Sequence, residues 1–363
     1  MPNSGLIVQS KLFVSGEGGY KRFRIPALVV STQGTVLAFC EARKFTGHDS
    51  DQIDLFLRRS FDNGATFEEV QLVTTEDGWV CGNPSPVVDS ETGAIVLLFC
   101  KNRKDDSQEM ICQGNAPRTV WVTSSSDDGA TWAEPQEITA SVKPSGWTWY
   151  CTGPGHGIQL GSDRLIVPSH HVVARSYDSD DPMYSHILYS DDRGETWQIG
   201  DSTTDGVGEC TAIETSDSQL YLNCRNTHQL PEGGNFRAVA WSDDSGENFS
   251  GLVPDPTLLE PCCEASVCRF TDVRQHDRNR VVFSNPAART RSQLTVRLSY
   301  DECRTWPIAK ELHAGPAAYS DLCIAPDMSI CCLYECGVKH RYETVTFARF
   351  DLEWFTNGKD RLC

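Results

Sequence analysis

Ser125-Ser126-Asp127-Asp128-Gly129-Ala130-Thr131-Trp132 is one of five copies of a pattern made of Ser, Asp, Gly and a closing aromatic residue. Asp and Ser side chains bond nearby backbone groups, Gly takes a positive φ and the aromatic ring anchors the segment, so each copy predicts a tight β-hairpin turn. Five copies along one chain predict a repeat protein. The copies span residues 60–67, 125–132, 190–197, 242–249 and 299–306, the last with Cys303 where the others have Gly.

Length and composition favour a large all-β protein that is built from repeated structural units. The chain of 363 residues is too long for one small core, and it is 39% hydrophobic and 9% aromatic, enough to bury a large one. Almost every segment alternates apolar and polar residues, or forms a short run of β-branched and aromatic residues between turn residues. No long helical pattern interrupts these segments.

Each turn closes a hairpin within a unit of four strands, named A to D in chain order. Five units with the turn and a sixth without it predict a single six-bladed β-propeller of four-stranded antiparallel sheets over residues 1–363, a ring that hides its sheet edges. Residues 6–14 are expected to complete the last blade. The expected A, B and C strands are 24–30, 35–43 and 53–60; 86–89, 94–101 and 120–125; 157–160, 164–170 and 185–190; 209–214, 219–225 and 237–242; 264–270, 280–284 and 293–299; 319–325, 329–335 and 343–350.

Charge and cysteine content exclude several classes of function. The formal charge of −18 opposes binding to nucleic acid and to anionic membrane surfaces. The 16 cysteines lack the spacing and the nearby histidines of a zinc site, so we expect buried reduced thiols and neither a metal nor an organic cofactor. Without a membrane-spanning run or a signal pattern, the expected location is cytoplasmic; a lysosomal protein, or a secreted one with its signal removed, is the alternative.

The strand template gathers chemically active side chains at one end of the blades. The start of strand A, the end of strand B and the B–C loop share that end, whereas the repeated turns lie at the other end and are predicted to be structural. Arginines that face one another repel unless an anion or carboxylates lie between them, so their convergence predicts an anion-binding mouth. The residues at this mouth are Arg24, Glu41, Arg43, Asp49, Asp51, Glu209, Arg225, Arg291, Tyr319 and Glu335.

Phe23-Arg24-Ile25-Pro26, followed by the repeated turns known as Asp boxes, resembles the exo-α-sialidases, also called neuraminidases. The resemblance covers essentially the whole chain. It implies that three arginines bind the carboxylate of sialic acid and that a Glu–Arg pair reads the O4 side of the sugar. The matching arginines are Arg24, Arg225 and Arg291, with Arg289 a rival for the third, and the matching pair is Glu41 and Arg43.

The same resemblance implies a tyrosine nucleophile with two acidic partners. Tyr319 matches the nucleophile, whereas Tyr334 is a decoy. The remaining matches are Glu209 for the base that activates the tyrosine, Glu335 for the acid that orients the first arginine, and Asp49 for the general acid/base, with Asp51 as the alternative.

These residue types suit a sialoside, whose own carboxylate lies beside the anomeric carbon and repels an anionic nucleophile. A neutral phenol avoids that repulsion, but its unperturbed pKa of about 10 means that it needs a base such as Glu209. The hypothesis is double displacement with retention, an exception to the two-carboxylate scheme of glycosidases. Tyr319 attacks, and Asp49 first protonates the leaving oxygen and then activates water. Because Asp49 must start protonated, we expect an acidic optimum.

The expected function is hydrolysis of terminal sialic acids from sialylated glycoproteins, gangliosides and oligosaccharides. Trans-sialylation and a non-catalytic sialic-acid-binding propeller are the alternatives. The longest B–C loops, 102–119 and 171–184, are expected to rim the mouth. Residues expected there to meet the glycerol and N-acyl arms are Gln108, Glu109, His170, His171 and Tyr177.

Overall fold

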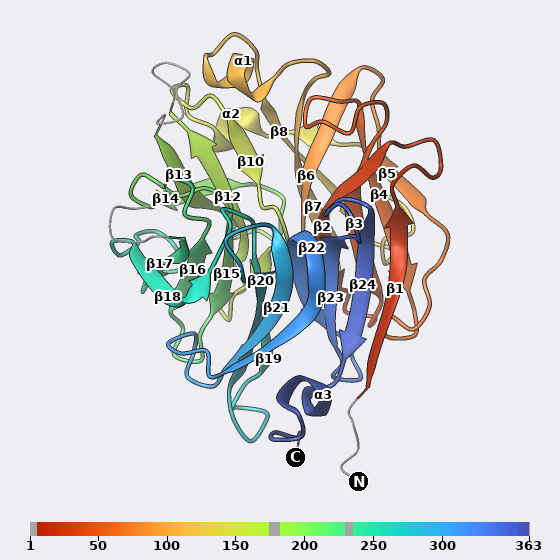
Figure 1. Ribbon diagram of the computed structural model, residues 1–363. Coiled ribbons are helices and arrows are strands. Elements are labelled where there is room, and N and C mark those ends of the chain that lie inside the picture. Colours follow the sequence, from red (N-terminus) through yellow and green to blue (C-terminus); the bar gives the residue numbers. More distant parts are fainter. Residues whose placement is uncertain (1–5, 174–181, 229–234, 363) are drawn as a thin grey trace.

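The computed structural model describes residues 6–173, 182–228 and 235–362, and its architecture is all-β (Figure 1). Short strands follow one another along the chain, and strands that are neighbours in sequence mostly pair antiparallel in space. Within the described ranges the helices are short, as the absence of a long helical pattern predicts. They are α1 (Gln108–Cys112), α2 (Thr139–Val142) and α3 (Leu352–Thr356).

The first two sequence units lie in one sheet, because Ile53 pairs in parallel with Val80 and links their strands. Within each unit the pairing is antiparallel, and the hairpin that joins the second and third strands of the first unit pairs Arg43 with Ile53. The strands are β2 (Arg22–Val30), β3 (Val36–Arg43), β4 (Ile53–Ser60), β5 (Gln71–Thr74), β6 (Trp79–Val88), β7 (Ile95–Arg103), β8 (Thr119–Ser125) and β9 (Gln136–Glu137).

The third and fourth units each form a separate antiparallel sheet. In the third, the strand predicted over residues 157–160 is shortened to β11, and an additional short strand, β10, precedes it; both pair with β12. The strands are β10 (Tyr150–Thr152), β11 (Ile158–Gln159), β12 (Leu165–Val172), β13 (Met183–Ser190), β14 (Gln198–Ser202), β15 (Cys210–Glu214), β16 (Leu220–Cys224), β17 (Phe236–Ser242) and β18 (Val253–Leu259).

One long strand, β22 (Ile308–Ile324), joins the last two units, because its first part pairs with β21 and its second part with β23. The amino-terminal strand β1 (Ile7–Val14) pairs with β24, as the sequence predicts. Shared strands merge neighbouring units into larger sheets, so the count of six blades stays a prediction. The other strands are β19 (Ser266–Thr271), β20 (Arg280–Pro286), β21 (Ser292–Ser299), β23 (Ile330–Cys336) and β24 (Thr344–Phe350).

The core lies between adjacent sheets. Leu28 and Phe56 of the first unit belong to the same buried cluster as Leu333 and Phe347 of the last, so the two ends of the sequence pack face to face. Cysteines fill these clusters as small apolar side chains, and Cys331 is fully buried.

The repeated turns satisfy their own hydrogen bonds. Gly129 N–H donates to Ser125 Oγ at 2.9 Å, and Asp127 accepts from Ser125 Oγ at 2.8 Å and from the backbone N–H and hydroxyl of Thr131 at 2.8 and 2.6 Å. In the first unit, the β3–β4 register places Ser60, where the turn begins, opposite Val36, at the far end of the hairpin from Arg43. This turn therefore lies away from the predicted mouth.

Close packing explains why most of these turns contain glycine. A Cβ on Gly129 would lie 2.6 Å from the Leu37 side chain, closer than real Cβ contacts come. In the fifth turn, Cys303 adopts a φ of 65° and its side chain packs in the cluster that contains Phe283 and Trp306. The fifth turn tolerates a side chain because its neighbouring sheet leaves room for one.

Candidate active site

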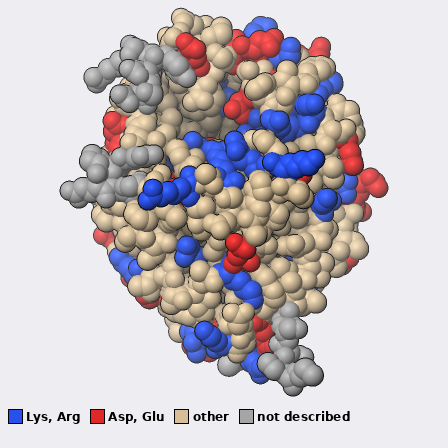
Figure 2. Space-filling model, in the orientation of Figure 1, with Lys and Arg blue, Asp and Glu red and all other residues tan. Residues whose placement is uncertain are grey.

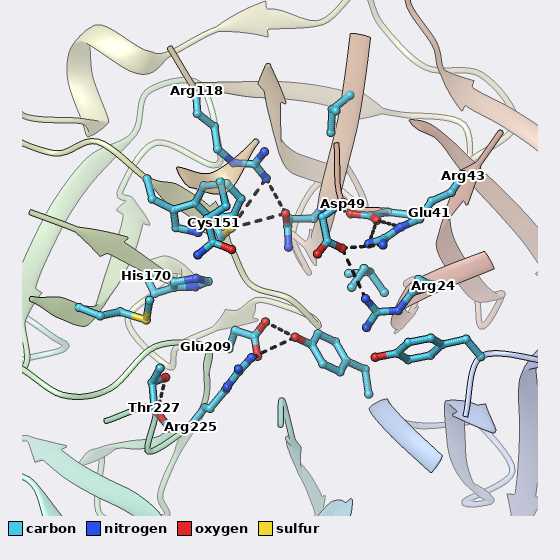
Figure 3. Close-up of a pocket in the computed structure, with 18 of the residues that line it drawn as sticks. Arg24, Glu41, Arg43, Asp49, Arg118, Cys151, His170, Glu209, Arg225 and Thr227 are labelled. Carbon is cyan, nitrogen blue, oxygen red and sulfur yellow. Dashed lines mark hydrogen bonds and ion pairs between the residues drawn. The ribbon is translucent and has the colours of Figure 1, made fainter. Parts of the chain in front are cut away.

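A cavity of about 310 Å³ is lined by the residues that the strand template brings to one end of the blades. Figure 3 shows Arg24, Arg43 and Asp49 on one side of it, and Glu209 and Arg225 on the other. These side chains come from segments far apart in sequence. Figure 2 shows Lys and Arg side chains gathered near the middle of the viewed face, although the protein carries a formal charge of −18.

Tyr319, in the second half of β22, presents its hydroxyl to Glu209. The hydroxyl donates to Glu209 Oε1, while Arg225 Nη1 donates to Glu209 Oε2 at 2.7 Å and to the Tyr319 oxygen at 3.2 Å. The backbone register is irregular between Ala317 and Ser320, which turns this part of the strand toward the cavity. A phenol, a base and a cation therefore meet at one point.

Protonation in this cluster favours proton transfer from the phenol. Burial and then the charge of Glu209 raise the pKa of Tyr319 well above its ordinary value, against the lowering effect of Arg225, so the phenol is neutral. Burial also raises the pKa of Glu209, but Arg225 and then His170 lower it more, to about 2. Glu209 is thus an anion that can accept the phenol proton as the oxygen attacks.

Arg24 and the nucleophile strand are held by one buried carboxylate, that of Glu335. Arg24 Nε and Nη2 donate to its two oxygens at 3.0 and 3.3 Å. The backbone N–H groups of Ile25 and Tyr319 donate to the same carboxylate at 2.9 and 3.2 Å. Loss of Glu335 would therefore leave a buried charge unpaired and disturb both the arginine and the tyrosine.

Arg291 differs from the other two arginines because its hydrogen bonds go to neutral groups. Its Nη1 donates to the Tyr342 hydroxyl at 2.9 Å and its Nη2 to the Cys262 carbonyl at 3.0 Å. Among the residues that the structure describes, no carboxylate lies within ion-pair distance of Arg291. The rival Arg289 is exposed and does not line the cavity. Arg291 therefore brings an uncompensated positive charge to the cavity.

Asp49 and Asp51 have different surroundings, although they lie in the same loop between β3 and β4. Asp49 is exposed at the cavity edge, 2.5 Å from Arg43 Nη1 and 3.5 Å from Arg24 Nη1. Loss of solvent around the carboxylate raises the pKa of Asp49, and the charges of Arg43 and Arg24 lower it more, to about 2. Asp51 is buried and accepts three backbone N–H groups of residues 45–47 at 2.6 to 2.9 Å. Asp51 thus organises the loop, and Asp49 faces the cavity.

Comparison with known proteins identifies the family. The sequence profile of the BNR repeat-like domain matches residues 34–332. An exo-alpha-sialidase of Aspergillus fumigatus is 30% identical over 94% of this chain and 86% of its own length. The chain belongs to the exo-α-sialidase family. Members of this family are glycoside hydrolases, and the chain is assigned to that enzyme class.

Other sialidases support the assignment. A sialidase of Micromonospora viridifaciens is 34% identical over 96% of this chain, which spans 54% of the length of that relative. The structure of the Hadza microbial sialidase Hz136 is similar to this one with a TM-score of 0.83 and 25% identity, over 96% of this chain and 69% of the other. The likeness therefore extends over nearly all of the chain in both sequence and fold.

Glu41 and Arg43 of this sialidase-family chain form a rigid pair beside Asp49. Arg43 Nε and Nη2 donate to Glu41 Oε2 at 2.9 and 2.6 Å, and Glu41 Oε1 accepts the backbone N–H of Asn83 at 2.8 Å. Both residues line the cavity. Their predicted role at the O4 side of the sugar stays a prediction.

Sequence reasoning missed a second wall of the cavity, built around Arg118. The guanidinium is buried, lies 4.3 Å over the Trp149 ring and donates to Asn83 Oδ1 at 2.7 Å and to the Tyr150 carbonyl at 2.6 Å. Arg118 lies just before β8, in the loop that the template already placed at the mouth. A search of that loop for cations would have found it.

The rim residues expected from sequence are only partly at the cavity. Gln108 and His170 line it, whereas Glu109 is exposed on α1 outside it. The His171 ring is buried and stacked between aromatic side chains. Tyr177 lies outside the described residues. The decoy Tyr334 is 1% exposed and belongs to the core, away from the cavity lining.

Within residues 6–173, 182–228 and 235–362, no group of three or more His, Cys, Asp or Glu side chains is arranged to hold a metal ion. No helix in those ranges has the length and apolar character needed to cross a membrane.

Proposed function

We propose that the chain is an exo-α-sialidase that removes terminal sialic acids from glycoproteins, gangliosides and oligosaccharides with retention of configuration. One observation carries the proposal: the Tyr319 hydroxyl donates to an ionised Glu209 inside a cavity lined by Arg24, Arg225 and Arg291. A neutral nucleophile beside clustered guanidiniums suits a substrate whose carboxylate adjoins its reacting carbon.

Binding begins with the substrate carboxylate. Arg24, Arg225 and Arg291 hold it through charge-assisted hydrogen bonds. The cavity of about 310 Å³ is large enough for one sugar residue. Because Arg24 also lies beside Asp49, the bound carboxylate brings a second negative charge close to Asp49 and raises its pKa. Substrate binding thereby promotes the protonated form of Asp49 that the first step requires.

In the first step the Tyr319 oxygen forms a bond to the anomeric carbon while the bond to the leaving oxygen breaks. The phenol proton passes to Glu209, and Asp49 gives its proton to the leaving oxygen. Arg225 contacts both the phenol oxygen and Glu209, so it stabilises negative charge that develops on either. The product of this step is a sialyl-enzyme.

The second step reverses these proton movements. Asp49, now a carboxylate, takes a proton from water as the water oxygen attacks the anomeric carbon. The bond to Tyr319 breaks, and the phenolate recovers its proton from Glu209. Two inversions at one carbon give net retention.

Release of free sialic acid from sialyllactose and from gangliosides, measured across pH, tests the proposal. We expect release from both, with an acidic optimum. Folded protein that binds sialic acid without releasing it would support a non-catalytic propeller instead. Added lactose distinguishes transfer from hydrolysis, because a trans-sialidase would form sialyllactose from another donor.

We also propose that residues 1–363 form a single six-bladed propeller with the cavity at the shared end of its blades; the six strand units of the sequence and the antiparallel pairing within them support it. Limited proteolysis that leaves one undivided core would agree with a single domain. The buried thiols of the core support a reducing compartment, and hence the cytoplasm, as the proposed location.

A further inference from the structure

Tyr342, in the loop between β23 and β24, connects two of the three arginines that are proposed to hold the substrate carboxylate. Its ring centroid lies 4.0 Å from the Arg24 guanidinium carbon, and its hydroxyl accepts from Arg291 Nη1 at 2.9 Å. The guanidiniums of Arg22 and Arg341 lie 5.4 and 4.9 Å from the same ring. Tyr342 itself lines the cavity. A neutral aromatic side chain is thus placed among like charges.

A carboxylate-binding cluster of arginines has an electrostatic conflict. Guanidiniums that are close enough to share one carboxylate repel each other when the site is empty. Arg24 and Arg225 relieve this repulsion through Glu335 and Glu209. An acid beside Arg291 would relieve it too, but it would neutralise the charge that attracts the substrate. The face of an aromatic ring and a phenol oxygen attract cations without cancelling their charge.

The loop that carries Tyr342 is held rigidly. The Glu343 carboxylate accepts the backbone N–H groups of residues 338–340 at 2.8 to 3.0 Å. The Tyr342 carbonyl accepts from Ser15 Oγ at 2.8 Å, and Ser15 Oγ accepts from Phe23 N–H at 3.3 Å, one residue before Arg24. Tyr342 is therefore tied to the same strand as the arginine that its ring covers.

We propose that Tyr342 is a positioning residue that holds Arg291 against Arg24 at the spacing needed by one carboxylate and leaves both guanidiniums charged. The proposal rests on the proposed function, because it concerns the same carboxylate site. Tyr342 acts through Arg291 and takes no part in bond making. The expected signature is therefore weakened binding with little change in the rate of the chemical step.

The Tyr342→Phe variant removes the hydrogen bond to Arg291 and keeps the ring over Arg24. Loss of a hydrogen bond to a charged group should raise the Kd for free N-acetylneuraminic acid, measured by calorimetry, about tenfold. KM for a fluorogenic sialoside should rise similarly, with kcat nearly unchanged. Tyr342→Leu, which also removes the ring, should bind more weakly still. An unchanged Kd for Tyr342→Phe would overturn the proposal.

Tyr334→Phe is the matched control, because Tyr334 is buried in the neighbouring strand β23 away from the cavity. It should leave Kd and KM unchanged. A rise equal to that of Tyr342→Phe would show that general loosening of this sheet is responsible and would reject a specific role. Unfolding temperatures of both variants should stay close to that of the wild type.

A double-mutant cycle tests whether Tyr342 acts through Arg291. If it does, Tyr342→Phe combined with Arg291→Ala should bind no more weakly than Arg291→Ala alone. Additive losses would contradict the proposal and indicate that the Tyr342 hydroxyl contacts the substrate directly.

Two readouts separate this proposal from the proposed function. Wild-type protein that binds sialic acid without turnover would reject hydrolysis, and the Kd comparison would still test Tyr342. If the wild type does not bind sialic acid at all, crystal structures of the wild type and Tyr342→Phe decide the question without ligand. The proposal requires the Arg291 guanidinium to shift relative to Arg24 in the variant. An unmoved Arg291 would refute it.

Discussion

The turn end and the cavity end of the strands use carboxylates in opposite ways. At the turn end, hydrogen bonds from Thr131 lower the pKa of Asp127 to about 2, and the partners of Asp127 lie within the same eight residues. At the cavity, the pKa of Glu209 is also about 2, where burial raises it and Arg225 lowers it more. The partners of Glu209 come from other strands and face open space.

This difference shows that neither repetition nor a lowered pKa identifies a reactive acid. The Asp127 carboxylate accepts three hydrogen bonds from its own turn, and these bonds account for its lowered pKa. The cavity instead keeps a base beside a phenol, and a cation, Arg291, that pairs with no acidic side chain in the described part of the chain. Function lies where distant groups converge and their charges are incompletely balanced.

The largest expected effect follows from removal of the nucleophile. Tyr319→Phe should lower kcat/KM for a fluorogenic sialoside by about 10⁴-fold or more, because it removes the atom that bonds to the sugar. Tyr334→Phe should retain full activity. Near-normal turnover by Tyr319→Phe would show that Tyr319 is not the nucleophile.

Replacing one carboxylate at the cavity end of the strands and one at the turn end should have contrasting effects. Glu209→Gln keeps the side-chain shape but cannot accept the phenol proton, so kcat should fall by about 10²- to 10⁴-fold. Asp127→Asn weakens a turn and should lower unfolding temperature while kcat and KM stay unchanged. If the Asp127 variant lost turnover without loss of stability, the turns would have a functional role.

The acid that protonates the leaving group can be recognised by its dependence on that group. Asp49→Ala should reduce kcat/KM on sialyllactose by about 10²- to 10⁴-fold. The loss should be smaller on an aryl sialoside, whose leaving oxygen needs less protonation. Asp51→Ala should mainly destabilise the protein, because Asp51 holds the loop backbone. Unchanged use of sialyllactose by Asp49→Ala would favour Asp51.

Arg43 should set the pH range over which Asp49 is protonated. In the free protein Asp49 has a pKa of about 2, and Arg43 is the first of the two guanidiniums that lower it. Arg43→Ala removes a cation that stabilises the carboxylate, so the pKa rises and the fall of kcat/KM with increasing pH moves to higher pH. Arg43→Lys keeps a positive charge and should shift the profile less. An unshifted profile for Arg43→Ala would contradict the pairing.

The smallest expected effects are on stability at the turns. Gly129→Ala forces a Cβ against Leu37 at a φ of 77°, and should cost about 1–3 kcal/mol of unfolding free energy. Cys303→Gly relieves backbone strain but removes a buried side chain, so these terms offset to within about 1 kcal/mol. Denaturant unfolding measures both, and turnover should not change. Lost turnover with unchanged stability would contradict a purely structural role for these turns.

Much of the strand order could be predicted because each turn marks the end of the third strand of its unit. Counting strands outward from them predicted Arg24 at the start of one strand and Arg225 at the end of another. The structure places Arg24 within β2 and Arg225 just after β16, and both line the cavity. Tyr319 was found in the same way, and its exposure to the cavity separates it from Tyr334. Period-two patterns and turn chemistry are local properties, so a single sequence contains them.

Most of the supporting contacts could not be predicted because they follow no local pattern. Arg118 lies in a loop that the strand template placed at the mouth, but its partners, like the side-chain direction of Tyr342, depend on tertiary packing. His171 was expected at the rim, but stacking turns its ring into the core. The partners of Asp51 are backbone N–H groups, which leave no signature in sequence. These contacts appear only when the strands are placed in space.

Trapping the sialyl-enzyme tests most directly whether Tyr319 is the nucleophile. A fluorinated sialosyl fluoride slows the second step, so the protein should gain the mass of one sialyl group. Peptide mapping by mass spectrometry should place that group on Tyr319, and Tyr319→Phe should gain none. Absence of an adduct during turnover, or an adduct on any other residue, would contradict the account.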